Sequence, residues 1–176
     1  MEWTTIISFR ADGLPKGQPR VRRSASGGMY TPTTADGWRF MLHTAARQAG
    51  LPKTPAEGPM RLEVAVLMPR PQRLLGRKSP AGRIPFTSKP DFDNLLKTVA
   101  DCLTNLGVWR DDAQVFSCDF SKWYVATGEK PGAEVVVEEG FGGEGIGAEG
   151  IKAMGIEASS AEKSVQPRRR VGRVIG

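Results

Sequence analysis

The sequence predicts a protein of the α/β (α+β) class, with a small mixed β-sheet packed against two main helices in the order β-α-β-α-β-β. The main observation is that segments of period-two apolar pattern are interspersed with two segments whose apolar residues recur every three or four positions. The 176 residues, 39% hydrophobic and 25% charged, also fit one globular domain with a modest core.

The first third of the chain predicts a strand, a loop and a helix. TTIISF, residues 4–9, is rich in β-branched residues and favours the first strand. GLPKGQPRVRRSASGG, residues 13–28, combines turn residues with four basic side chains and favours an exposed loop. A helix is then expected from Thr33 or Thr34 to Gly50. Its apolar face is predicted to consist of Trp38, Leu42, Ala45 and Ala49.

The middle of the chain predicts a strand and a long basic loop. MRLEVAVLMP, residues 60–69, alternates clearly and favours a strand. Residues 69–90, PRPQRLLGRKSPAGRIPFTSKP, hold five prolines, two glycines, six basic residues and no acidic residue, and are predicted to lack regular structure. A basic loop of this length is suited to binding the phosphate backbone of a nucleic acid. A plain solvated loop is the alternative reading.

A second helix and two strands complete the predicted domain. Asp93 or Asn94 is expected to cap a helix that ends before Gly107. Its apolar stripe is predicted to be Leu95, Leu96, Val99, Leu103 and Leu106. FSCDFSKWYV, residues 116–125, favours a strand bent by a bulge, and AEVVVEE, residues 133–139, favours the last strand. We expect residues 1–140 to form the domain and residues 141–176, which are Gly-rich and partly basic, to be a flexible tail.

The charge is distributed unevenly along the chain. Residues 1–90 carry fifteen basic and five acidic residues, a net charge of +10, whereas residues 91–140 carry −6 and residues 141–176 carry +2. Such a pattern suits a polyanion-binding surface around an acidic centre. The sequence has neither a membrane-spanning apolar run nor a signal peptide, and its two cysteines form no CxxC pair. We therefore expect a cytoplasmic protein with no membrane association.

Asp91 and Asp93 lie two residues apart in the motif KPDFDN, just before the second predicted helix. In an extended segment, such side chains point to the same side. Hard divalent cations such as Mg²⁺ prefer oxygen ligands and take one or two carboxylates at phosphate-processing sites. Asp91 and Asp93 are therefore candidate metal ligands. The alternative is that Asp93 only caps the helix and interacts with its dipole.

Further charged residues lie along and after this helix. Lys97, one turn beyond Asp93, either stabilises charge on a phosphate or forms an exposed pair with Asp93 worth about 0.3–0.5 kcal/mol. Asp101 is interpreted as a surface partner of Lys97. Asp111 and Asp112 follow the helix, which is about 20 Å long. Whether Asp112 reaches Asp91 and Asp93 depends on how the chain returns, and the residues leave this open.

The run KPDFDNLLKTVADCLTNLGVWRDDAQV resembles the signature of RusA-type Holliday junction resolvases. The shared features are a Pro-Asp-x-Asp-Asn start, a lysine four residues after the second Asp, a helix, and a Trp-x-Asp-Asp turn. GLPKGQPRVRR is also similar to an early Pro-Lys-x-x-Pro-Arg segment of that family. The resemblance is dense over residues 89–115, looser over 4–88, and ends near residue 140.

This resemblance implies site residues and partners. Asp91, Asp93 and Asp112 correspond to metal-binding residues, Lys97 to a catalytic lysine, and Asp111 to a neighbouring acidic position that is a further candidate ligand. It also implies that the Asp112 end folds back to Asp91 and Asp93. The family forms homodimers, binds four-way DNA junctions and nicks two strands symmetrically with Mg²⁺. Its members are often encoded by phages, so the expected setting is a bacterial or phage-infected cell.

The sequence therefore predicts a Mg²⁺-dependent endodeoxyribonuclease that resolves four-way junctions in DNA recombination and repair, with Mn²⁺ as an alternative ion. The metal lowers the pKa of a water and polarises the phosphate, while Lys97 neutralises transition-state charge. The junction arms are expected to contact basic residues, mostly through phosphates. These are Lys16, Arg20, Arg22, Arg23, Arg70, Arg73, Arg77, Lys78, Arg83 and Lys89.

Three other functions compete with this one. A nuclease of broader branched-DNA specificity fits the same residues, because junction geometry is not encoded in a motif. A non-catalytic protein that binds branched DNA fits the basic residues, but the four acidic positions and Lys97 argue against it. A phosphatase with a DxD motif needs a buried apolar strand before the motif, and the preceding FTSKP is polar and turn-like.

Overall fold

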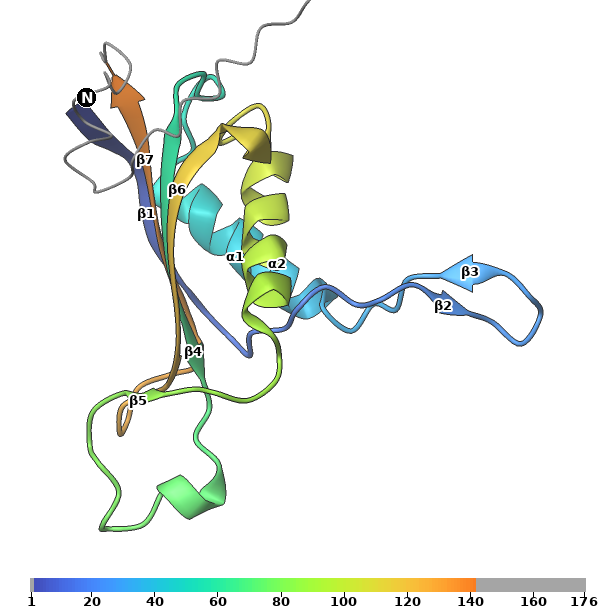
Figure 1. The fold of residues 1–176 in the computed structure, drawn as a ribbon, viewed down its shortest axis with the longest axis vertical. Helices are drawn as coiled ribbons and strands as arrows, with labels where there is room; N and C mark the ends of the chain where they lie inside the picture. The colour runs from blue at the N-terminus through green and yellow to red at the C-terminus, as the bar shows by residue number, and fades with distance from the viewer. Residues whose placement is uncertain (1, 142–176) are drawn as a thin grey trace, which may run out of the picture. The chain divides into compact units, whose positions relative to one another are not determined.

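The computed structural model describes residues 2–141 and shows a mixed five-stranded sheet with two long helices on one of its faces (Figure 1). In the sheet the strands lie in the order β1 (Glu2–Asp12), β7 (Gly132–Phe141), β4 (Met60–Met68), β6 (Val115–Tyr124) and β5 (Ile84–Pro85). Among the strands of this sheet in residues 2–141, only β4 and β6 pair in parallel. The helices are α1 (Asp36–Ala49) and α2 (Phe92–Asn105). The predicted α+β class and the predicted order of the main elements are confirmed.

The two loops that were expected to be irregular contain short elements. A separate hairpin of β2 (Arg22–Arg23) and β3 (Met29–Tyr30) lies between β1 and α1. The loop after β4 contains the 3₁₀ helix η1 (Gln72–Leu74) and the short strand β5. A second 3₁₀ helix, η2 (Asp112–Gln114), lies outside both loops and precedes β6. No helix within residues 2–141 is long and apolar enough to cross a membrane. The predicted tail, apart from Phe141, lies outside the described residues.

The core lies between the sheet and the helices. The central strand β4 buries the alternating residues Met60, Leu62, Val64 and Val66, as its pattern predicts. From α1, Trp38 and Leu42 are buried as predicted, but the stripe continues to Ala46, because it recurs every four residues. Ala45 is only partly buried and Ala49 is exposed at the helix end. From α2, the buried face includes Leu95, Val99 and Leu103. Truncating a leucine in such a position costs about 2–5 kcal/mol.

The two ends of α2 determine where the acidic residues lie. The helix begins at Phe92, so Asp91 occupies the N-cap position in extended conformation, with φ −68° and ψ 151°. This corrects the prediction that Asp93 or Asn94 is the cap. At the other end, Gly107 has φ +69°, and the amides of Gly107 and Val108 bond back to Thr104 and Leu103 at 3.0 and 3.1 Å. This Schellman ending reverses the chain toward β6.

The predicted bulge in β6 is present at its start. Val115 pairs with Met60 and Ser117 with Arg61, which leaves Phe116 as the additional residue. The Phe116 ring is 60% exposed and stacks on Trp3 with ring centroids 6.2 Å apart. After the bulge, β6 runs antiparallel to α2, because the two are joined by the turn at residues 106–114. Because of this direction, Asp91 and Asp93 lie at one end of α2, and Asp111 and Asp112 lie at the other.

Candidate active site

The N-terminal end of α2 carries Asp91 and Asp93 into an open hollow of about 650 Å³. Both residues are exposed, and within residues 2–141 their carboxylates form no hydrogen bond or ion pair. The hollow is lined by Thr87, Ser88, Lys89, Asp91, Phe92, Asp93 and Lys122. Helix dipoles favour negative charge at this end, and two neighbouring carboxylates form an oxygen donor set for a divalent cation.

Lys122 is a member of this hollow that the sequence reading missed. Its ammonium donates to the carbonyls of Ser88 and Pro90 at 3.0 and 2.9 Å and lies 4.9 Å from the centroid of the Phe86 ring. Lys122 therefore fixes the segment that leads into Asp91. Lys122 pairs with the buried Val66 of β4, which turns this lysine toward the helix side. The pairing joins two strands that are distant in the chain, so no local pattern of the sequence indicates it.

Lys97 lies one helical turn beyond Asp93, and its side chain is 62% exposed. Its ammonium pairs with Asp101 at 3.3 Å, as predicted for Asp101, and forms no ion pair with Asp93. The Asp101 carboxylate also accepts a hydrogen bond from Gln18, whose amide oxygen accepts one from Arg39. Asp101 is thus more than a surface partner, because it fastens the loop after β1 to α2.

Asp111 and Asp112 lie beyond the C-terminal end of α2 and differ in their roles. The Asp111 carboxylate accepts from the amide of Ala113 at 2.8 Å, and the Gln114 side chain accepts from the amide of Asp111 at 3.1 Å, which forms a capping box for η2. Gln114 also donates to the carbonyls of Ala56 and Gly58. Asp112 is exposed on this anchored turn, and within residues 2–141 its carboxylate has no intrachain partner.

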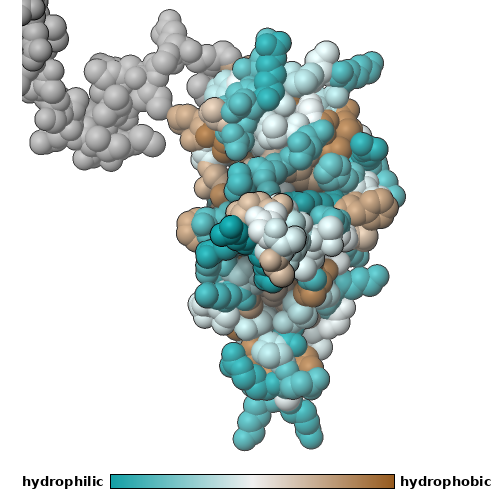
Figure 2. Space-filling model, turned by 90° about the vertical axis from the view of Figure 1, so that its right-hand side faces the viewer, coloured by the Kyte–Doolittle hydropathy of each residue, from teal (hydrophilic) through white to brown (hydrophobic). Residues whose placement is uncertain are grey.

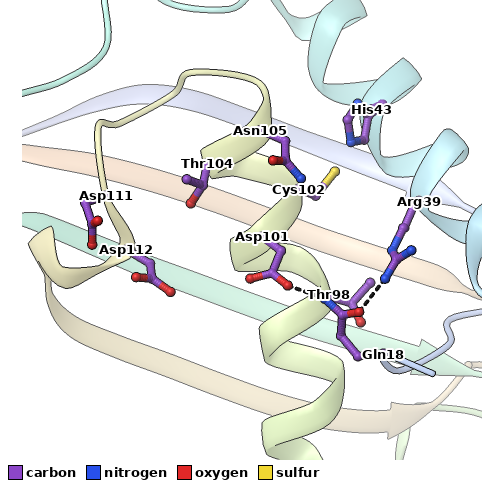
Figure 3. A pocket seen from close by; sticks show the side chains of 10 residues that line it. All are labelled: Gln18, Arg39, His43, Thr98, Asp101, Cys102, Thr104, Asn105, Asp111 and Asp112. Carbon is purple, nitrogen blue, oxygen red and sulfur yellow. Dashed lines mark hydrogen bonds between the residues drawn. The ribbon is translucent and has the colours of Figure 1, made fainter. Parts of the chain in front are cut away.

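A polar pocket of about 420 Å³ lies beside this turn, between α1, α2 and η2 (Figure 3). Figure 3 shows Asp111 and Asp112 on one side of it and the Arg39–Gln18–Asp101 chain of hydrogen bonds on the other. Burial, with the charges of Arg47 and Arg39, lowers the pKa of His43. Burial also raises the pKa of the Cys102 thiol to about 12, so this cysteine is an inert core residue.

The two acidic pairs lie at opposite ends of α2. A 14-residue helix is about 21 Å long, and β6 returns along it from Val115 to Lys122, which reaches the Asp91 segment. Within residues 2–141, no group of three His, Cys, Asp or Glu side chains is close enough to share one metal ion. The expectation that Asp112 folds back to Asp91 and Asp93 is therefore wrong within a single chain, since the joining turn lies at the far end of the helix.

The predicted DNA-contacting residues fall into two groups. Arg70 and Arg83 are engaged within the chain. Arg70 donates to the carbonyls of Val125, Leu74, Pro80, Ala81 and Gly82, and Arg83 pairs with Glu129 and Glu134. The other eight are exposed, and within residues 2–141 their side chains form no hydrogen bond or ion pair; they are Lys16, Arg20, Arg22, Arg23, Arg73, Arg77, Lys78 and Lys89.

Two comparisons with known proteins show the family of the chain. A family model described as endodeoxyribonuclease RusA matches residues 12–138, which include both helices and all four acidic positions. A Bacillus subtilis (strain 168) protein named uncharacterized protein YqaN is 33% identical over 141 residues, which cover 76% of this chain and 96% of that protein. The chain therefore belongs to the RusA endodeoxyribonuclease family, and this membership implies endonuclease activity of the Holliday junction resolvase type.

Proposed function

We propose that this protein is a Mg²⁺-dependent, structure-selective endodeoxyribonuclease that resolves four-way DNA junctions by paired symmetric nicks. One observation carries the proposal: Asp91 and Asp93 present two carboxylates without intrachain partners, within residues 2–141, at the start of α2. Exposed basic residues lie on the hairpin that precedes α1 and on the β4–β5 loop. Acidic residues that gather beside a DNA-binding surface need a cation between themselves and the phosphates.

The donor set fits Mg²⁺, because Asp91 and Asp93 offer only oxygen atoms and the open hollow leaves room for water ligands. Mn²⁺ accepts the same ligands. When bound, the ion supplies a water of lowered pKa and a positive charge against the phosphate. Lys97 contributes an ammonium one turn from Asp93, and its exposure lets it turn from Asp101 to a phosphate oxygen. Lys122 acts by positioning the segment before Asp91.

A homodimer completes this site. The outer edge of β6 is paired by β5 at Trp123 and Tyr124, and the Lys122 carbonyl accepts from the Phe86 amide, so within residues 2–141 the edge from Val115 to Ser121 has no neighbouring strand. Unpaired strand edges are ready to pair with another chain. If two chains pair along this edge across a two-fold axis, α2 of one chain lies antiparallel to α2 of the other. Asp112 of one chain would then lie beside Asp91 and Asp93 of the other. Two such composite sites would suit two nicks in opposed strands.

The central test is the Asp91→Asn variant, assayed on a labelled four-way junction. With Mg²⁺ we expect the wild-type chain to nick two opposed strands and the variant to lose cleavage, because a neutral amide is a poor ligand for a hard cation. Binding should be kept or improved, because a negative charge that faces DNA is removed. Replacing Mg²⁺ with EDTA should have the same effect on the wild-type chain as the substitution.

Glu63→Gln is the matched control, because Glu63 is an exposed carboxylate on β4 outside the proposed site. It should cleave like the wild-type chain. Unimpaired cleavage by Asp91→Asn would overturn the metal site. A shifted band without any nick, in Mg²⁺ as in EDTA, would indicate a binding protein. Equal rates on junctions, flaps and linear duplex would indicate a nuclease of broader specificity.

A further inference from the structure

The hairpin of β2 and β3 projects away from the five-stranded sheet (Figure 1). Its turn is closed by the amide of Ser24 bonding to the Gly28 carbonyl at 2.7 Å, and Gly27 has φ +86°. The hairpin nevertheless exposes apolar side chains: Met29 is 69%, Val21 57% and Tyr30 48% exposed. A two-stranded ribbon in water is marginal, so apolar residues on it indicate a surface that binds a partner.

The pairing of the ribbon gives each of its faces two kinds of side chain. Arg22 lies opposite Tyr30, and Arg23 lies opposite Met29. Residues directly opposite each other point to the same side, so each face combines one guanidinium with one flat or flexible apolar group. Residues 13–35 contain four basic residues and no acidic residue. The combination of positive charge and stacking groups matches a nucleic acid, whose phosphates and base faces offer the complementary features.

The base of the hairpin is fixed to the helix that carries the candidate site. A Cβ atom on Gly17 would lie 2.4 Å from Nδ2 of Asn94, so the loop approaches α2 as closely as only glycine allows. The Gln18 amide bonds to the Asn94 carbonyl at 3.4 Å, and its side chain bonds to Asp101. A molecule bound to the ribbon is therefore held at a defined position relative to Asp93, the residue before Asn94.

Figure 2 looks along the hairpin, which points toward the viewer, and shows hydrophilic side chains at the lower end, where the β4–β5 loop lies. This loop exposes Arg73, Arg77 and Lys78. The hairpin and the loop thus extend from the sheet at two separate places, and both carry basic side chains.

From these observations we propose that the hairpin reads the branch point: Tyr30 and Met29 stack on bases that the branch leaves unstacked, while Arg22 and Arg23 bind the flanking phosphates. This inference rests on the proposed action on branched DNA. In continuous duplex the base faces are covered by their neighbours, and inserting a side chain requires unstacking. At a branch this requirement is reduced, so the same contact favours branched over linear DNA.

The test uses the full chain in EDTA, so that DNA is bound and not cut. A four-way junction carries 5-iododeoxyuridine either at the branch or within an arm, and long-wavelength light joins the base to a stacked aromatic side chain. We expect a crosslink to the peptide that contains Tyr30 for the branch position alone. Tyr30→Ala combined with Met29→Ala should reduce the ratio of junction to duplex affinity roughly tenfold while duplex affinity is largely kept.

Two further variants separate stacking from other effects. Tyr30→Phe keeps the ring and should keep the affinity ratio. Phe40→Ala removes an aromatic ring that is 68% exposed on α1 and is not part of the hairpin, and it should change neither the ratio nor the crosslink. The proposal is overturned if the double variant keeps the wild-type ratio, if the crosslink maps to another peptide, or if the double variant changes the sedimentation of the protein, which would assign these side chains to a second copy of the chain.

The wild-type result separates this inference from the proposed function. If the wild-type chain cuts junctions in Mg²⁺ but the double variant is unaltered, only the role of the hairpin is overturned. If the wild-type chain neither prefers nor cuts branched DNA, the proposed function and the inference that rests on it are both overturned.

Discussion

At the scale of single residues, the arginines of the β4–β5 loop divide into structural and exposed ones. Arg70 directs donors from all three of its guanidinium nitrogens to five backbone carbonyls, so few N–H groups are left for a phosphate. Arg83 pairs with Glu129 and Glu134, which Arg10 also contacts. Arg77, by contrast, is exposed. Residues of one type, a few positions apart, thus have different functions.

The cluster around Arg83 predicts a dependence of stability on pH. The hydrogen bond from Arg83 is the main cause that lowers the pKa of Glu129 from its ordinary value of 4.5 to about 2. The stability that this pair contributes is therefore fully present above pH 4.5 and is lost as the pH falls toward 2. In Arg83→Gln we expect the free energy of unfolding at pH 7 to fall by about 1 kcal/mol. The difference from wild type should shrink at pH 2.

Urea denaturation of both proteins at pH 7, 4.5 and 2 measures this difference. Arg77→Gln is the matched control, because it removes an exposed guanidinium of the same loop and should leave the stability unchanged at every pH. A constant difference between Arg83→Gln and wild type across these pH values would contradict the assignment of the ion pair.

At the scale of elements, α2 has a different function at each end. Its start presents Asp91 and Asp93, and its Schellman ending sends the chain to the Asp112 turn. Asn94 in its first turn and Asp101 further along both bond Gln18, which fastens the base of the hairpin. The β4–β5 loop has little regular structure of its own, because residues 69–83 contain only a single 3₁₀ turn. It depends instead on Arg70, whose acceptors include Pro80 and Ala81 within the loop.

Arg70→Lys should loosen this loop without unfolding the domain. One ammonium cannot reproduce a guanidinium fork that reaches five carbonyls. We expect faster hydrogen exchange in peptides from residues 71–83 and a several-fold loss of junction affinity, because Arg73, Arg77 and Lys78 lose their fixed placement. Arg73→Lys, the same conservative change at an exposed position, should leave exchange as in wild type. Equal exchange in all three proteins would show that Arg70 does not order the loop.

At the scale of the whole molecule, the candidate site is divided between two ends of one chain. Asp91 and Asp93 lie at one end of α2, and Asp112 lies at the other, about 21 Å away along the helix. A single copy cannot bring these carboxylates to one ion. The proposed two-fold dimer through the edge of β6 would bring them together.

Two inactive variants should restore each other when mixed. One chain carries Asp91→Asn and Asp93→Asn, and the other carries Asp112→Asn. In the mixed dimer, one composite site joins the intact Asp91 and Asp93 of the second chain to the intact Asp112 of the first. We expect no cleavage by either variant alone and nicking of one strand per junction by the mixed dimer, isolated with two different affinity tags.

The control is a dimer in which both chains carry Asp91→Asn and Asp93→Asn, isolated with the same two tags. This dimer should stay inactive. If the mixed dimer is inactive although each variant still dimerises and binds junctions, the sites are not shared between chains. A wild-type chain that sediments as a monomer at micromolar concentration contradicts the dimer itself.

The sequence predicted most of the fold, because its signals are local. The alternation in β4, the helical stripe of α2 and the glycine at its end depend on residues within a few positions of each other. The motif around Asp91 likewise identified the family. The start of α2 at Phe92 was missed because an extended Asp91, rather than Asp93, satisfies the backbone geometry of the cap. The short hairpin β2–β3 was missed because two-residue strands have no period to detect.

By itself, then, the sequence determined the α+β class, the acidic motif and the basic character of two loops. The tertiary structure alone decided which charges are available. In the folded chain, Arg70 and Arg83 bond to groups of the same chain. Lys122 contacts the segment before Asp91, 32 residues away, and Asp112 lies at the far end of α2. These outcomes depend on contacts between residues distant in the chain and on the direction in which β6 returns, and no pattern of neighbouring residues encodes either.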